Sequence, residues 1–225
     1  MVLGVLFDLD DTLVDLDRAA RSAIRVHLAD LGLPQDDTTP DRWRAAEERH
    51  FGRFLAGELG FQAQRRERVR ELLDGDLDDD AADSWYADYL VRLEAEWACF
   101  DDVRSTLEAL DDRGLPVGIV TNLDASLQRR KLELVGLGDR FDVLVGLDAL
   151  GVGKPDPTVF HHACGLLGTP PSQTAFVGDR LDHDALGARD AGLRAVWLDR
   201  NGSSDAVPDG VTRVGSLHEL VEVLG

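Results

Sequence analysis

Two carboxylates, Asp8 and Asp10, follow an aliphatic run near the start of the chain, VLGVLF at residues 2–7. In an extended chain the side chains at positions i and i+2 lie on one face, so these negative charges would repel each other. A divalent cation or a proton between them relieves that repulsion, and Mg²⁺ prefers oxygen ligands and commonly works with phosphate. The hydroxyl of Thr12 can donate to an anion. The pattern predicts a magnesium and phosphate site, and its alternative is a solvated turn whose acids cap a helix.

Three further segments carry polar side chains at comparable places. Thr121 and Asn122 end an apolar run and can donate to a phosphate oxygen, although such residues before a helix are usually N-caps. Lys154, in the sequence GKPDP, can neutralise a carboxylate or a phosphate as a compact charge. Asp179 ends another apolar run and suits a second metal carboxylate, with Asp184 close behind it.

From residue 101 onward, short apolar runs alternate with segments of helical periodicity, which indicates a parallel sheet covered by helices on both faces. The predicted strands are 2–7, 117–122, 141–146, 174–179 and 193–199, and the predicted helices are 101–113, 123–136, 157–167, 182–191 and 216–224. Ser216 and Glu219 have the spacing of a capping box. We predict an α/β fold with a doubly wound, Rossmann-like parallel sheet. Ligands bind such sheets beyond the carboxyl ends of the strands, where the four polar segments lie.

Residues 15–98 have a different pattern, because helical periodicity runs through nearly all of them and strand signals are absent. The predicted helices are 16–31, 40–73 and 81–97. A helical block between the first strand and the rest of a sheet is typical of an inserted cap. We therefore predict an α/β core made of residues 1–14 and 99–225, and a helical cap domain made of residues 15–98.

The composition limits the partners of the chain. Its net charge of −19, from 43 acidic and 24 basic residues, would repel nucleic acid and anionic membranes. No apolar run approaches the roughly 20 residues needed to cross a bilayer, and the N-terminal run lacks the basic flank of a secretory signal. Cys99 and Cys164 lie far apart and form no metal-binding pattern. We expect a cytoplasmic protein, monomeric or homodimeric, that binds neither nucleic acid nor membrane.

In this order, the segments DLDDT, a strand-ending Thr, GKPDP and GDRLDHD resemble the motifs of the haloacid dehalogenase-like hydrolases, and of their phosphatases in particular. The resemblance implies that Asp8 is a nucleophile that forms an aspartyl-phosphate, and that Asp10 serves as general acid and then as general base. It also implies Mg²⁺ as cofactor, held by Asp8, Asp179 and the backbone carbonyl of Asp10.

The same resemblance assigns the phosphoryl group to Thr121 and Lys154. Asn122 is a further candidate phosphate donor by its position after the predicted strand, beside Thr121. Asp184 would support the metal water or Lys154, and Thr12 would support the first motif. The chain departs from the common pattern at Arg180 and His183, where other members often carry Ser or Thr and Asn, and neither change removes a metal ligand.

Rival activities of the same family require other residues. Asp10 argues against a dehalogenase, which lacks the Asp-x-Asp pair, and the absence of lysine between residues 15 and 100 argues against a phosphonate hydrolase that forms a Schiff base. A phosphomutase shares the nucleophile and the metal and stays open, as does a binding protein on the same fold. We expect a Mg²⁺-dependent phosphatase acting on a small phosphorylated metabolite; sugar phosphates, phosphoglycolate and nucleoside monophosphates are all compatible with the sequence.

Overall fold

A parallel sheet carries the polar segments predicted above. The computed structural model describes residues 1–224, and within them six strands pair in the order β3-β2-β1-β4-β5-β6, all in parallel. The strands are β1 (Gly4–Phe7), β2 (Val117–Val120), β3 (Val143–Val145), β4 (Thr174–Gly178), β5 (Arg194–Leu198) and β6 (Val211–Val214). Strands β2 and β3 lie in turn on one side of β1, and strands β4, β5 and β6 lie in turn on its other side. The strand order therefore reverses between β1 and β4.

The two strands at this reversal are apolar and fully buried, as the continuous aliphatic runs predict. Their register pairs Phe7 with Val177, and the amide of Asp8 donates to the carbonyl of Val177 at 2.9 Å. The residues that follow β1 and β4 therefore leave the sheet side by side.

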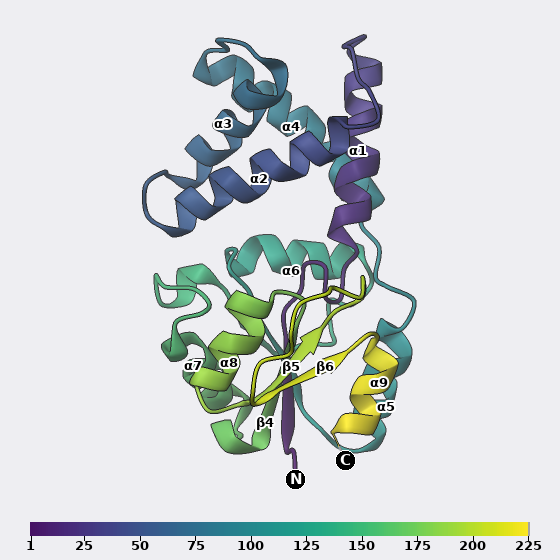
Figure 1. Cartoon of the computed structure of the whole chain (residues 1–225), viewed down its shortest axis with the longest axis vertical. Coiled ribbons are helices and arrows are strands. Elements are labelled where there is room, and N and C mark those ends of the chain that lie inside the picture. The colour runs from purple at the N-terminus through teal and green to yellow at the C-terminus, as the bar shows by residue number, and fades with distance from the viewer. Residues whose placement is uncertain (225) are drawn as a thin grey trace. The chain divides into compact units, whose positions relative to one another are not determined.

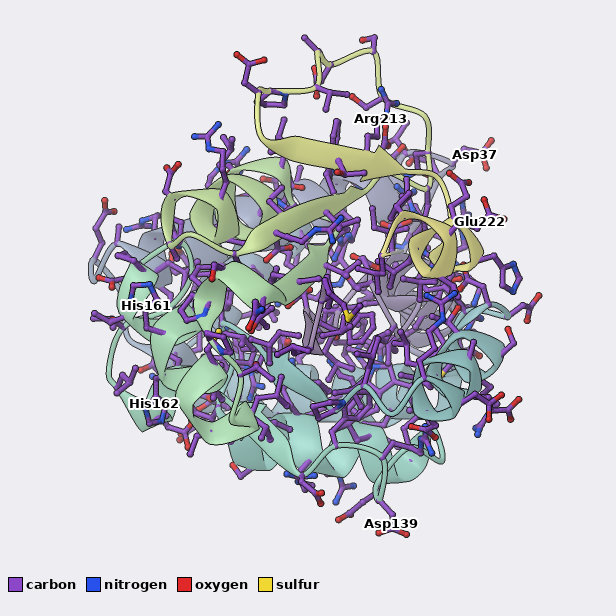
Figure 2. All side chains as sticks on the ribbon, turned by 90° about the horizontal axis from the view of Figure 1, so that it is seen from below. Asp37, Asp139, His161, His162, Arg213 and Glu222 are labelled. Carbon is purple, nitrogen blue, oxygen red and sulfur yellow. The ribbon has the colours of Figure 1, made fainter. Side chains whose placement is uncertain are left out.

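Helices cover both faces of this sheet and confirm the predicted α/β class. The helices α7 (Pro157–Leu167) and α8 (Gly187–Asp190) lie on one face, and α5 (Val103–Asp112) and α9 (Leu217–Val223) lie on the other (Figure 1). Seen from below, His161 and His162 of α7 and Glu222 of α9 point outward from opposite sides of the molecule (Figure 2). Between α7 and the sheet, the rings of Phe160 and Phe176 pack edge to face with their centroids 4.9 Å apart.

Residues 1–15 and those from 99 onward form one compact unit, and Leu16–Ala98 form a second one. The helices of the second unit are α1 (Leu16–Asp30), α2 (Thr39–Leu55), α3 (Phe61–Leu73) and α4 (Asp79–Glu96). Its core contains Trp43, whose indole donates to the hydroxyl of Tyr89 at 2.9 Å. No helix within residues 1–224 is both long and apolar enough to span a membrane.

The structure corrects three details of the predicted elements. The segment 40–73 is two helices rather than one, because the chain turns at Gly57, whose φ is +75°, and restarts after Gly60. The strand β6 was not predicted. The predicted helix 182–191 begins with a π-helical turn, Leu181–Leu186, before it continues as α8.

The start of α9 also differs from the predicted capping box, because the Ser216 side chain caps no backbone amide. The buried carboxylate of Asp102 does so instead, accepting from the amide of Leu217 at 2.9 Å. Two nitrogens of Arg200 donate to the same carboxylate at 2.8 and 2.9 Å, and one of them also donates to the carbonyl of Thr12 at 3.1 Å. Asp102 thus ties the last helix to the loop that follows β1.

We expect Asp102→Ala to destabilise the α/β unit by about 3 kcal/mol, because it leaves the Arg200 charge and a helix amide without their partner. Urea denaturation followed by tryptophan fluorescence measures this loss. The neighbouring Asp101 is exposed, so Asp101→Ala is a matched control that should change the free energy of unfolding by less than about 0.5 kcal/mol. Equal losses in both variants would contradict the assignment.

Candidate active site at the ends of β1 and β4

Three carboxylates converge where the strand order reverses. Asp8 follows β1, Asp179 follows β4, and Asp184 lies on the π-helical turn; each offers an oxygen, and these oxygens lie within 4.8 Å of one another. The approach of Asp184 depends on Gly178, because a Cβ atom there would lie 2.3 Å from the Asp184 carboxylate. The amide of Arg180 donates to Asp184 at 3.0 Å and fixes it in this position.

A single buried ammonium group lies among these carboxylates. The Nζ atom of Lys154 is 2.6 Å from an oxygen of Asp8 and 2.7 Å from one of Asp184. The side-chain amide of Asn122 holds the Lys154 backbone on both sides, accepting from its amide at 2.7 Å and donating to its carbonyl at 2.9 Å. His183 Nδ1 also lies 3.0 Å from that carbonyl. Asn122 therefore positions Lys154, and its predicted contact with phosphate stays a prediction.

The side chain of Asp10 lies outside the carboxylate cluster. One of its oxygens forms an ion pair with Lys131 of α6 (Ala125–Leu134), and the other accepts from the amide nitrogen of Gln128 at 2.8 Å. The same Gln128 nitrogen donates to the hydroxyl oxygen of Thr121 at 2.9 Å. The amide of Leu123 donates to that hydroxyl oxygen as well, at 3.4 Å.

Thr12 joins the loop after β1 to the end of β4. Its hydroxyl donates to the Asp179 carboxylate at 3.3 Å and accepts from the Asp179 amide at 3.1 Å. On the other side, the indole of Trp197 donates to the Asp179 carbonyl at 2.9 Å. These three contacts fix both the backbone and the side chain of Asp179.

Burial and mutual repulsion raise the pKa of two of these carboxyl groups. Burial is the main reason why the pKa of Asp8 rises to about 7; the charge of Lys154 opposes the rise, and the charges of Asp184 and Asp10 add to it. Burial followed by the charges of Asp184 and Asp8 raises the pKa of Asp179 to about 8. The charge of Lys154 is thus insufficient to keep Asp8 and Asp179 fully ionised at neutral pH. A hard divalent cation fits the oxygen donors that the cluster offers.

The structure brings together most of the residues predicted from the sequence: Asp8, Thr12, Lys154, Asp179 and Asp184 contact one another. Asp10 and Thr121 form a second group, in which Gln128 contacts both residues and Lys131 contacts Asp10. Neither Gln128 nor Lys131 was predicted as a site residue. One signal in the sequence points to Lys131, because Lys131 and Lys154 are the only lysines among 24 basic residues.

Known proteins resemble this chain in both sequence and fold. A family model of haloacid dehalogenase-like hydrolases matches residues 2–192. The chain is 34% identical to a phosphoglycolate phosphatase of Chromobacterium violaceum over 99% of this chain and 96% of that protein. It is 37% identical to a phosphoserine phosphatase of Thermus thermophilus, over 60% of this chain and 54% of that protein.

Among solved structures, the magnesium-bound HAD-hydrolase YfnB of Bacillus subtilis has the same fold, with a TM-score of 0.86 and 23% identity over 99% of this chain and 98% of that one. The six-stranded parallel sheet, the carboxylates at its strand reversal and the family match over residues 2–192 confirm the resemblance seen in the four motifs. The chain belongs to the haloacid dehalogenase-like hydrolases.

Proposed function

We propose that this chain is a Mg²⁺-dependent phosphatase that hydrolyses a small phosphorylated metabolite through an aspartyl-phosphate on Asp8. The observation that carries the proposal is the buried contact of Lys154 with Asp8, inside a cluster of carboxylates at the strand reversal. A nucleophilic carboxylate, a cation site and a fixed positive charge are what phosphoryl transfer requires.

The relatives support the substrate class. The two named above are phosphatases of small phosphorylated acids, phosphoglycolate and phosphoserine. For this chain we propose the wider class of small phosphorylated metabolites. Four expectations stay predictions. Residues 15–98 would act as a substrate-selecting cap, and the protein would be cytoplasmic. It would be a monomer or a homodimer, and it would bind neither nucleic acid nor membrane.

In the proposed first step an oxygen of Asp8 attacks phosphorus, and the bond from phosphorus to the leaving oxygen breaks. Asp10 gives a proton to that oxygen. Lys154 and the Thr121 hydroxyl hold the phosphoryl oxygens; since the Thr121 oxygen already accepts from Gln128 and Leu123, its proton can point to the substrate.

In the second step a water attacks phosphorus and gives its proton to Asp10, and the bond between phosphorus and Asp8 breaks, which releases inorganic phosphate. Mg²⁺, when bound by Asp8, Asp179 and the Asp10 carbonyl, would neutralise the charge of the phosphoryl oxygens. The carboxylate of Asp184 would keep Lys154 charged and in place between the two partners that it contacts.

Phosphate release from p-nitrophenyl phosphate tests the proposal. We expect turnover that requires Mg²⁺, that EDTA abolishes, and that Asp8→Asn lowers by at least about 10³-fold because the nucleophile is lost. Asp139 is exposed on the outside of the unit (Figure 2), so Asp139→Asn is the matched control and should retain activity. Unchanged turnover by Asp8→Asn would rule out the aspartyl-phosphate. Silence of the wild type on this ester and on a panel of metabolite phosphates would favour a mutase or a binding protein.

The raised pKa values of Asp8 and Asp179 predict how Mg²⁺ stabilises the fold. Without metal, Asp8 and Asp179 bind more protons in the folded chain than in the unfolded chain between pH 4 and 8, so the stability from these two groups is lost as pH rises through about 7 to 8. Mg²⁺ replaces those protons. We therefore expect saturating Mg²⁺ to raise the Tm by about 5 °C or more at pH 8, and by less at pH 6.

The variant Asp179→Asn separates two contributions to the Tm, the repulsion among the carboxylates and the binding of Mg²⁺. It removes one repelling carboxylate, so the metal-free Tm at pH 8 should rise while the gain from Mg²⁺ shrinks. Differential scanning fluorimetry at pH 6 and pH 8, with and without Mg²⁺, measures both changes. A Mg²⁺-induced gain that is equal at both pH values would contradict the linkage.

A further inference from the structure

Each acid of the Asp-x-Asp pair has a lysine of its own. Lys154 contacts Asp8, and Lys131 contacts Asp10. Both lysines are buried: 5% of the surface of Lys154 and 3% of that of Lys131 is exposed, although lysine usually lies at the protein surface. The chain thus places its only two lysines beside its two proposed reacting carboxylates.

A second buried side chain completes the surroundings of Asp10. Gln128 lies three residues before Lys131, hence on the same face of α6, and it is fully buried. Its nitrogen lies 2.8 Å from one Asp10 oxygen, while Lys131 contacts the other oxygen. Both carboxylate oxygens of Asp10 are therefore fixed from a single helix, and the nitrogen of Gln128 also reaches Thr121.

We propose that Gln128 and Lys131 are positioning residues that hold the Asp10 carboxylate apart from the metal-binding carboxylates and direct it to the leaving oxygen. This inference rests on the proposed phosphatase function and deepens it. It assigns a role in the reaction to α6, a helix that contributes no residue to the predicted motifs.

The need for such a device follows from the spacing of the two acids. Asp8 and Asp10 are only two residues apart, so a cation at Asp8 also attracts the side chain of Asp10. A carboxylate that ligates a cation loses its freedom to carry a proton to the substrate. Lys131 supplies Asp10 with a separate positive charge, and the cluster of converging carboxylates indeed consists of Asp8, Asp179 and Asp184, without Asp10.

These contacts leave Asp10 able to act as the general acid of the proposed reaction. Each carboxyl oxygen has two lone-pair positions, so an oxygen that accepts from Lys131 or Gln128 retains one position for a transferable proton. Because Gln128 bonds to both Asp10 and Thr121, it also fixes the proton carrier relative to the side chain that would hold the phosphoryl group. Misplacement by about 1 Å is enough to slow such a reaction by about 10²-fold.

A purely structural ion pair is the competing explanation, and the leaving group distinguishes the two. Phenolate is a far poorer leaving group than p-nitrophenolate, so phenyl phosphate depends more on a well-placed general acid. The value of kcat/KM covers the chemistry up to the release of the leaving group. We therefore compare kcat/KM for phenyl phosphate and p-nitrophenyl phosphate in the wild type and in Lys131→Met, Gln128→Met and Lys131→Arg.

We expect Lys131→Met and Gln128→Met to lower kcat/KM for phenyl phosphate at least about tenfold more than for p-nitrophenyl phosphate. Lys131→Arg, which keeps the charge, should recover part of the loss. Arg130 is the exposed neighbour on α6, so Arg130→Met removes the same charge as a control and should affect both esters equally little. A persistent Mg²⁺-induced rise in Tm would show that the variants fold and retain the cation site.

Equal losses for both esters, or no loss, in variants that fold and respond to Mg²⁺ would overturn the positioning role while leaving the phosphatase proposal intact. A Lys131→Met variant that unfolds while Gln128→Met keeps the wild-type ratio of the two esters would also overturn it, in favour of a structural ion pair. A wild type that hydrolyses neither ester nor any metabolite phosphate would overturn the proposed function, and this inference with it.

Discussion

Electrostatic repulsion among buried and half-buried carboxylates is the constraint on which the site depends. Asp8, Asp179 and Asp184 meet at the strand reversal, and Asp10 lies two residues from the first of them. Burial makes each negative charge more costly, which is why Asp8 and Asp179 retain protons to near-neutral pH without a cation. Only a partner with positive charge can relieve this repulsion while the groups stay ionised and reactive.

The rest of the α/β unit holds these charges in place. Gly178 leaves room for Asp184, Asn122 fixes the backbone of Lys154, and Trp197 and Thr12 fix Asp179. These contacts come from segments that are remote in the sequence and are united by a parallel sheet. Placing a site on the ends of rigid strands gives it the accuracy that a loop alone would lack.

The sequence alone was enough to predict the strands β1 to β5 and the carboxylates that follow β1 and β4, because both leave local signals. An apolar run that ends in Asp8 or Asp179 predicts a buried strand and a charge at its end without knowledge of its neighbours. The contact of Lys131 with Asp10 is different, since it joins residues 121 positions apart and depends on the angle at which α6 packs. Likewise, Asp102 caps α9 across 115 positions, which no local capping pattern could reveal.

Buried lysines also make this site unusually suited to chemical probing. A reagent that acylates primary amines finds no lysine on the surface of the chain, because Lys131 and Lys154 are both inaccessible in the folded state. Acylation of either ε-amine requires the surrounding structure to open first. The rate at which such a reagent modifies these two lysines therefore measures how often the site opens locally. In most proteins the modification of surface lysines would obscure this signal.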